Sequence, residues 1–174
     1  MKVLVVVDMQ NDFIDGSLGT AEAEAVVPAV MERIRSFEGR VIATRDTHSE
    51  DYLNTEEGRH LPVIHCVKGT EGWKIRREID ALLDEKAAVR IDKPTFGSVE
   101  LGSYVKELDD EAGVEEITLI GVCTDICVIS NALLLKANLP KAEIRVDASC
   151  CAGVTPESHE RALEAMKSCQ IDIV

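Results

Sequence analysis

The chain has 174 residues, 45% of them hydrophobic, and a mean hydropathy of zero. This size and composition predict one globular domain over residues 1–174, with no need for a second. The formal net charge of −13 argues against a nucleic-acid surface, because phosphates would be repelled and no basic cluster offsets the charge.

The first residues do not have the pattern of an export signal. Met1 and Lys2 are followed by only five apolar residues before Asp8, and no small-residue cleavage site follows. No apolar run approaches the roughly 18 residues of a membrane span. We therefore expect a cytoplasmic protein whose six cysteines are reduced thiols rather than disulfides.

The first part of the chain predicts two strands, a helix and a long loop. Apolar residues 3–7 and 40–44 predict the strands. Between them, a helix from about Ala21 carries one apolar face, made of Val27, Val30, Met31, Ile34 and Phe37. From Asp46 to Trp73 the chain is polar, irregular and longer than a strand-to-helix connection needs. Long irregular loops on such a scaffold tend to be functional.

The rest of the chain continues the alternation of helices and strands. Four more strands are predicted at residues 87–91, 116–121, 143–146 and 171–174. Helices are marked by three apolar stripes and by a mostly apolar segment after Cys127. The first stripe is Ile75, Ile79 and Leu82, the second is Leu101, Val105 and Leu108, and the third is Ala162, Leu163, Met166 and Cys169. Nearly continuous apolar strands are typical of a sheet covered on both faces. The pattern predicts an α/β fold, a doubly wound, mostly parallel six-stranded sheet in a Rossmann-like three-layer sandwich.

Cys127 is the most informative single residue. The segment from Gly121 to Cys127 lies between a buried strand and an apolar helix, and predicts a sharp turn capped by Thr124 or Asp125. Free N–H groups and the helix dipole would favour a thiolate in the first turn. Cysteines usually pack as small apolar residues, which is what we expect of the other five, Cys66, Cys123, Cys150, Cys151 and Cys169. Cys127 differs because open α/β sheets bind ligands at the carboxyl ends of their strands. It is a candidate nucleophile.

Two charged residues follow other predicted strands directly. Asp8 comes after residues 3–7, and it either caps a turn or acts as a base beside a thiol. Lys93 comes soon after residues 87–91, and it is either a solvated surface lysine or an ammonium that favours a thiolate and a developing oxyanion.

The long loop gathers histidines and carboxylates. It contains Asp46, His48, Glu57, His60 and His65, which include three of the four histidines of the chain. Asp46 and His48 are alternate residues at a strand end, so both side chains can point the same way, as metal ligands must. The alternative is that these loop histidines bind no metal.

Taken together, these motifs resemble the cysteine hydrolase family that includes nicotinamidases, isochorismatase-like proteins and N-carbamoylsarcosine amidases. The resemblance runs through residues 8–13, Asp46-Thr47-His48, residues 65–72, residues 93–98 and residues 121–127. It implies a catalytic triad of Asp8, Lys93 and Cys127. It also implies a cis peptide between Val122 and Cys123, with the backbone N–H groups of Cys123 and Cys127 forming an oxyanion hole.

Within the family, the nicotinamidases look closest because they bind a metal beside the triad. Asp46, His48 and His65 match that ligand pattern, and we assign the last ligand to Glu57, with His60 as its competitor, because Asn54 stands eight residues after Asp46. Such a set accepts zinc, iron or manganese.

The resemblance also implies a substrate pocket, with one departure from the pattern. Phe13 and Val122 are the expected substrate-contacting residues. Nicotinamidases often carry an aromatic residue shortly before the histidine that corresponds to His65, whereas residues 61–64 here are Leu-Pro-Val-Ile. The segment around Lys93 matches cysteine hydrolases in general.

The function implied is hydrolysis of a small carboxamide through a cysteine thioester, with nicotinamide, an NAD-salvage substrate, as the first choice. Carbamoyl or ureido compounds and isochorismatase-type chemistry are the alternatives within the family. A thiol redox protein is disfavoured because Cys123 and Cys127 lack the two-residue spacing of a thioredoxin motif. A non-catalytic binding module stays open. We expect a homo-oligomer that contacts neither nucleic acid nor membrane.

Overall fold

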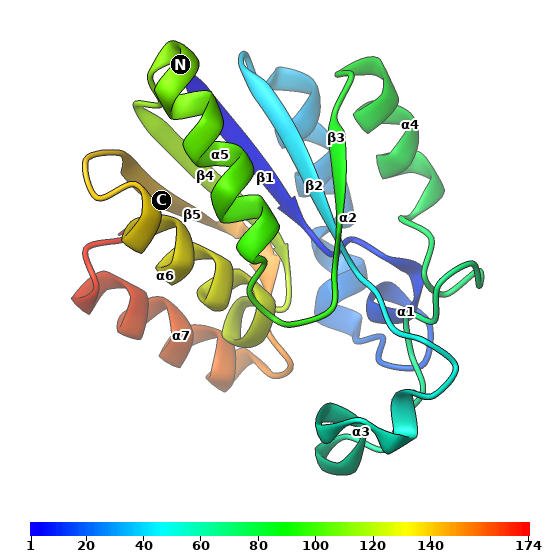
Figure 1. The fold of residues 1–174 in the computed structure, drawn as a ribbon. Helices are drawn as coiled ribbons and strands as arrows, with labels where there is room; N and C mark the ends of the chain where they lie inside the picture. The colour runs from blue at the N-terminus through cyan, green and yellow to red at the C-terminus, as the bar shows by residue number, and fades with distance from the viewer.

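The computed structural model describes residues 1–174 and contains one six-stranded sheet (Figure 1). Every strand pairing is parallel, and the spatial order is β3-β2-β1-β4-β5-β6. The strands are β1 Lys2–Val7, β2 Arg40–Asp46, β3 Val89–Lys93, β4 Glu116–Val122, β5 Glu143–Ala152 and β6 Asp172–Ile173. The predicted doubly wound architecture is confirmed, and the sheet is parallel throughout.

Helices cover both faces of this sheet. Figure 1 shows α5, α6 and α7 over one face and α2 behind the other. The α-helices are α1 Asn11–Ile14, α2 Ala21–Ser36, α3 Glu56–His60, α4 Arg77–Glu85, α5 Val99–Ala112, α6 Ile129–Asn138 and α7 Pro156–Ser168. A 3₁₀ helix, η1, spans Tyr52–Asn54, and a π-helix, η2, spans Thr124–Val128. All of these helices are too short or too polar to cross a lipid bilayer.

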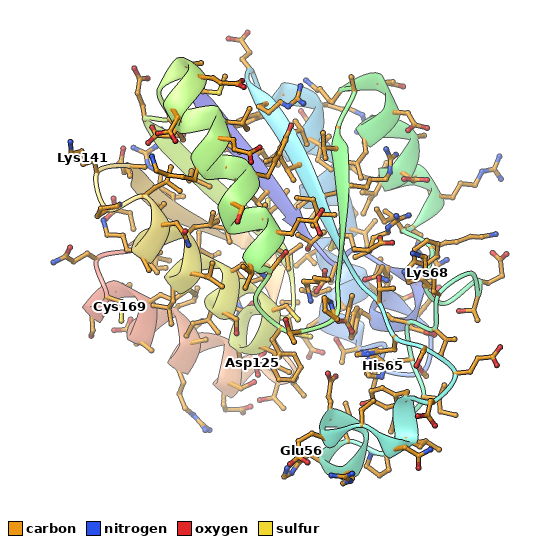
Figure 2. The ribbon with its side chains drawn as sticks, viewed as in Figure 1. Glu56, His65, Lys68, Asp125, Lys141 and Cys169 are labelled. Atoms are coloured by element: carbon orange, nitrogen blue, oxygen red, sulfur yellow. The ribbon has the colours of Figure 1, made fainter.

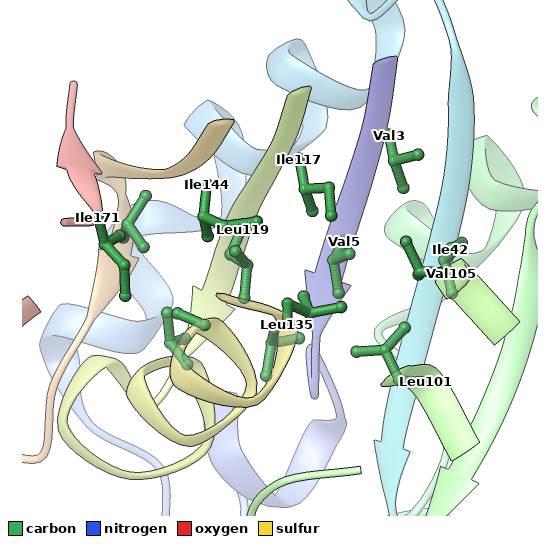
Figure 3. Packing of buried hydrophobic residues seen from close by; sticks show 14 of the residues in the cluster. Val3, Val5, Ile42, Leu101, Val105, Ile117, Leu119, Leu135, Ile144 and Ile171 are labelled. Atoms are coloured by element: carbon green, nitrogen blue, oxygen red, sulfur yellow. The ribbon is translucent and has the colours of Figure 1, made fainter. Parts of the chain in front are cut away.

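The core is divided between the two faces by the alternation of side chains along each strand. Val3 and Val5 of β1 point to one face, where they pack with Leu101 of α5 and Leu135 of α6 (Figure 3). Leu4 points to the other face and joins the cluster that contains residues of α2 and α4. Side chains of neighbouring strand residues point in opposite directions, so a continuous apolar strand fills both layers. Each fully buried Val, Leu or Ile contributes about 1.5–3 kcal/mol to stability.

Gly121 lets β1 and β4 approach closely near their carboxyl ends. Its φ is +115°, and a Cβ built there would lie 2.1 Å from the carbonyl oxygen of Val7. The β4–β5 register also shifts between Leu119 and Gly121. Asp8 and the segment that begins at Cys123 therefore leave the sheet side by side.

Several predicted elements have different limits in the structure. β5 extends to Ala152, well beyond residue 146, because pairing with β4 resumes after the register shift. The second predicted helix begins only at Arg77, since Ile75 forms a bridge with Gln10. The loop after Asp46 was expected to be irregular, yet it contains η1 and α3; Thr55 caps α3 by accepting a hydrogen bond from the N–H of Gly58.

Cys169 corrects one prediction about the core. We expected it in the buried stripe of the last helix, but α7 ends at Ser168 and the Cys169 side chain is exposed. Cys123 is half-buried, whereas Cys66, Cys150 and Cys151 are buried as expected.

Candidate active site

Asp8 follows β1 directly and is completely buried. Its φ is +47°, a left-handed conformation that aspartate adopts more readily than most residues. Oδ1 accepts a hydrogen bond from Thr44 Oγ1 at 2.7 Å, and Oδ2 lies 2.7 Å from Nζ of Lys93. Oδ2 is therefore the carboxylate oxygen that faces the Lys93 ammonium.

Lys93 is the last residue of β3, and its side chain has no exposure to solvent. Its Nζ donates to the carbonyl oxygen of Thr95 at 3.2 Å and to Cys127 Sγ at 3.4 Å. It also lies 3.4 Å from Asp46 Oδ1. The ammonium therefore joins a carboxylate, a thiol and a second carboxylate in one buried cluster. The alternative of a solvated surface lysine is wrong.

Cys127 lies in η2, directly before α6, and is 4% exposed. Neither Thr124 nor Asp125 caps this helix, contrary to the sequence prediction. Thr124 Oγ1 instead bonds His159 Nδ1 at 2.8 Å, and Asp125 Oδ1 accepts from the N–H of Val154 at 3.1 Å. Both side chains tie the turn to the segment after β5, so Cys123 occupies the N-cap position without a side-chain cap.

The protonation of the cluster also differs from the sequence prediction. Burial and the nearby Asp8 carboxylate raise the pKa of the Cys127 thiol well above its usual value, although Lys93 opposes them. Burial likewise raises the pKa of Asp8, against the attraction of Lys93. Burial lowers the pKa of Lys93, but the attraction of Asp8 and the other neighbouring acids is larger, so the net shift of this pKa is upward. Desolvation is the largest of these effects on the sulfur, so the shift in the Cys127 pKa opposes the thiolate that the helix dipole would favour.

A non-proline cis peptide joins Val122 to Cys123, as the family resemblance implies. The N–H of Cys123, between β4 and η2, donates to no backbone carbonyl. Val122 itself is fully buried at the end of β4. The turn therefore offers a free backbone donor beside the thiol.

Four side chains of the long loop converge next to this cluster. Ligand atoms of Asp46, His48, Glu57 and His65 all lie within 4.8 Å of one another. Asp46 Oδ2 is 2.9 Å from His48 Nε2 and 3.4 Å from His65 Nε2. Glu57 Oε1 lies 3.6 Å from His48 Nε2 and 3.7 Å from His65 Nε2. The four donors form a compact group at the ends of the strands.

Neighbouring residues fix the direction of the two histidines. His65 Nδ1 donates to the carbonyl oxygen of Val63 at 2.8 Å, which leaves Nε2 facing the group. A hydrogen bond of this kind is the usual support of a metal-binding histidine. The ring of the buried Tyr52 lies 4.6 Å from that of His48 and 4.9 Å from that of His65, and its hydroxyl donates to the carbonyl oxygen of Leu61. Burial and the charges of Glu57 and Asp46 raise the pKa of Tyr52 to about 12.

The geometry and the charge of the group fit a divalent metal ion. Ligands held about 2.1 Å from one ion are themselves about 3.0–3.4 Å apart, close to the observed separations. Two imidazoles and two carboxylates are donors that zinc, iron and manganese accept. With Asp8 included, three carboxylates face one ammonium, so a divalent cation would neutralise the remaining negative charge. Burial and the charge of Asp46 raise the pKa of Glu57.

Figure 2 shows His65 between the strand ends and α3, with Glu56 on the outer side of α3. The competitor for the last ligand position, His60, lies on this exposed side and pairs with Glu56 at 3.1 Å. It is not part of the group. Phe13 is buried, and its ring lies 5.6 Å from that of His65. Phe13 thus lies against the group, on the side of α1.

Sequence reasoning missed the residue that holds Asp46. The buried Gln10 accepts from the Asp46 N–H at 2.7 Å and donates to the Asp46 carbonyl oxygen at 2.8 Å. Asp46 is the residue shared between the Lys93 cluster and the histidine group, so Gln10 fixes their relative position. The sequence signal was a polar residue two positions after Asp8, in an otherwise buried segment. Tyr52 was missed as well, because its loop was expected to be irregular.

This arrangement can perform acyl transfer. A thiol, a carboxylate that can take its proton, an ammonium and a free backbone N–H lie together in a buried site. The adjacent group of donors can hold a metal ion beside this cluster.

Comparison with known proteins gives consistent matches over the whole chain. An isochorismatase domain model matches residues 2–174. A nicotinamidase/pyrazinamidase of Mycobacterium tuberculosis is 29% identical over 185 residues, covering 100% of this chain and 98% of that protein. The pyrazinamidase of Pyrococcus horikoshii, solved in complex with zinc, is 32% identical with a TM-score of 0.80, over 99% of this chain and 98% of that one. The pyrazinamidase/nicotinamidase of Streptococcus mutans is 25% identical with a TM-score of 0.86, over 100% of both chains.

Proposed function

The chain belongs to the isochorismatase family, as its motifs predicted, and we propose that it hydrolyses nicotinamide to nicotinate and ammonia. One observation supports this most strongly. Lys93 Nζ lies 2.7 Å from Asp8 Oδ2 and 3.4 Å from Cys127 Sγ, beside a four-donor group suited to a metal. The relatives named for nicotinamide and pyrazinamide support the choice of an aromatic carboxamide.

In the proposed first half-reaction, Asp8 Oδ2 accepts the proton of the Cys127 thiol. The sulfur then attacks the carboxamide carbon, and the backbone N–H groups of Cys123 and Cys127 stabilise the oxyanion. Asp8 returns the proton to the leaving nitrogen, the C–N bond breaks and ammonia departs. Lys93 stabilises the negative charge on sulfur while the proton is on Asp8.

In the second half-reaction, water replaces ammonia. Asp8 takes a proton from this water, and the hydroxide attacks the thioester carbon. The C–S bond breaks, nicotinate is released, and the proton on Asp8 returns to the Cys127 sulfur. Net consumption is one water for each amide, and Asp8 acts as base and acid in each half.

We propose Asp46, His48, Glu57 and His65 as the ligands of a zinc, iron or manganese ion. A bound ion would supply a Lewis-acidic centre for a ring nitrogen of the substrate. Asp46 Oδ1 also lies 3.4 Å from Lys93 Nζ, so these four residues would hold an ion, and a substrate on it, close to the cluster. Phe13 and Val122 are the proposed apolar walls of the pocket. Orientation of this kind can account for a large part of a rate enhancement.

The assignment of the substrate is tested by an ammonia-release assay. Nicotinamide, pyrazinamide, aliphatic carboxamides, and carbamoyl and ureido compounds are compared with and without a chelator. We expect turnover of nicotinamide that is lost on chelation and restored by added metal. Turnover of only a carbamoyl or ureido compound would overturn the choice of nicotinamide, and the non-aromatic segment at residues 61–64 makes this comparison necessary.

The role of Cys127 is tested separately by substitution. Cys127→Ser should lower kcat for nicotinamide by on the order of 10⁴-fold or more, as loss of a nucleophile does, and should prevent capture of a thioester in acid-quenched samples. Cys169→Ser, which alters an exposed cysteine away from the cluster, should keep full activity. Unchanged turnover in Cys127→Ser would exclude the thioester route.

We also propose that residues 1–174 act as one catalytic domain and that the protein forms a homo-oligomer. The family model spans residues 2–174, which supports the first proposal. Sedimentation equilibrium tests the second, which requires a mass of two or more times 19.0 kDa.

A further inference from the structure

Asn131 is a fully buried polar residue in the mostly apolar α6, one helical turn after Cys127. Its Oδ1 accepts a hydrogen bond from the N–H of Ser98 at 2.9 Å. Its Nδ2 donates to the carbonyl oxygens of Phe96 at 3.0 Å and Cys127 at 2.7 Å. One side chain therefore joins the helix of the thiol to the loop that connects β3 to α5.

The same loop orients the Lys93 ammonium. Lys93 Nζ donates to the carbonyl oxygen of Thr95 at 3.2 Å, and it reaches Cys127 Sγ at 3.4 Å. These contacts close a ring. It runs from Cys127 through Asn131 to Phe96 and Ser98, back along the loop to Thr95, and through Lys93 to the sulfur.

Asn131 makes the hydrogen bonds that join the two sides of this ring. The hydrogen bonds between residues 94–98 and α6 are all made by Asn131. The loop also packs closely on α6, since a Cβ built at Gly97 would lie 3.3 Å from Leu134 Cδ1 and 3.4 Å from the carbonyl oxygen of Ser130. Ser98 caps α5 by accepting from the N–H of Leu101, which fixes only the far end of the loop.

We propose that Asn131 is a positioning residue that sets the Lys93 ammonium against the Cys127 sulfur. It touches neither the substrate nor the reacting atoms, and it acts through the loop carbonyl that Lys93 contacts. The inference rests on the roles proposed above for Lys93 and Cys127.

Loss of this link should affect the chemical step more than binding. The proposed metal ligands and Phe13 come from β2, the long loop and α1, none of which bonds to Asn131. Substrate affinity should therefore be kept. A displacement of about 1 Å at a reacting group can cost on the order of 10²-fold in rate.

The experiment compares Asn131→Ala with Asn138→Ala. Asn138 is an exposed residue of the same helix, whose Nδ2 also donates to the carbonyl four residues before it, that of Leu134, at 2.8 Å. The control removes a similar helix contact far from the cluster. Two measurements are made on each variant: the kcat and KM for nicotinamide, and the rate at which iodoacetamide alkylates Cys127 relative to the exposed Cys169, by peptide mass spectrometry.

For Asn131→Ala we expect kcat to fall about 10- to 100-fold while KM changes less than about threefold. The alkylation rate of Cys127 should fall in parallel and that of Cys169 should not change. Asn138→Ala should match the wild type in every measurement. An unchanged kcat, a loss confined to KM, or normal alkylation of Cys127 in folded Asn131→Ala would overturn the proposal.

If Asn131→Ala does not fold, a second variant tests the same contact between the loop and α6. Gly97→Ala tightens the contact of the loop with Leu134 and Ser130, so the loop or Leu134 must shift by a few tenths of an ångström, and no polar group is removed. It should lower kcat and Cys127 alkylation in the same direction but by a smaller factor, about two- to tenfold, with a smaller loss of stability. If Gly97→Ala has wild-type kinetics and normal alkylation, the loop does not control the cluster and the proposal fails.

Alkylation also separates this inference from the proposed function, because it needs no amide substrate. If wild-type protein turns over no amide, the proposed function fails, but slowed alkylation in the Asn131 variant still supports the positioning role. If Cys127→Ser abolishes turnover and the Asn131 variant is normal, only the positioning role is wrong.

Discussion

The charged side chain of Lys93 is fully buried. The carboxylates beside it offset the cost of burying that charge. Its side chain and that of Asp8 are fully buried and lie 2.7 Å apart, and Asp46 is the second acidic neighbour. Removal of one member of a buried ion pair leaves the other without compensation, which is more costly than the pair itself is stabilising. The same residues therefore bear on both folding and the proposed chemistry.

A substitution at Lys93 makes this dependence measurable. Lys93→Met keeps the length of the side chain but leaves Asp8 and Asp46 facing each other without a cation, so the free energy of unfolding should fall by about 3–5 kcal/mol, and amide turnover should be lost. Lys68→Met provides the control, since Lys68 is 65% exposed and pairs with Asp92 on the surface. Its effect should stay below about 1 kcal/mol. Urea unfolding measures both, and equal stabilities for the two variants would contradict the prediction.

At the level of the elements, the contact between β1 and β4 brings the reacting groups together. Parallel strands place their carboxyl ends at the same edge of a sheet. Asp8 follows β1, the turn with Cys127 follows β4, and Lys93 ends β3, two strands away from β1. The close approach at Gly121 requires a residue without a Cβ, because φ is +115° and the Val7 carbonyl oxygen occupies the space.

Gly121→Ala should therefore be strongly destabilising and should reduce turnover of the folded fraction. The backbone conformation alone costs about 1–3 kcal/mol for a residue with a side chain, and the 2.1 Å contact with Val7 adds to it. Gly69→Ala is the matched control, since Gly69 also has a positive φ, +88°, but nothing lies within 4 Å of a Cβ built there. Thermal and urea unfolding should show a larger loss at Gly121. Equal losses would mean that the close contact between the strands contributes nothing.

At the scale of the whole molecule, the proposed metal ligands connect parts of the chain that the sheet alone does not hold. Asp46 ends β2, Glu57 lies in α3, and His65 lies in the segment after it. Figure 1 shows α3 projecting beyond the end of the sheet. An ion bound by all of these residues would tie the projecting segment to the core, and binding to the native state alone stabilises that state.

Metal added to chelator-treated protein should therefore raise the melting temperature. At 100 times the dissociation constant the gain is about 2.7 kcal/mol, or roughly 5–10 °C for a chain of this size. Glu57→Gln should lose most of this shift, whereas Glu56→Gln, which alters the exposed neighbour paired with Arg59 and His60, should keep it. Differential scanning calorimetry with zinc or manganese makes the measurement. An equal shift in the two variants would exclude Glu57 as a ligand.

Much of this protein follows from its sequence. The apolar runs predict the six strands because a strand buried on both faces has no polar positions to interrupt it. Asp8, Lys93 and Cys127 follow or end such runs, and a parallel sheet brings those ends to one edge. Motif order also predicted the cis peptide at Val122 and the family itself.

Tertiary structure decided what depends on contacts between distant segments. It placed Glu57 inside the donor group and His60 outside, it showed Gln10 holding Asp46, and it linked Asn131 to the loop of Lys93. It also showed that burial opposes a thiolate at Cys127, because a local pattern reveals the helix dipole but not how completely other elements remove water. A strand pattern depends on neighbouring residues in the sequence. Desolvation and side-chain pairing depend on residues from distant segments, which meet only when the helices pack on the sheet.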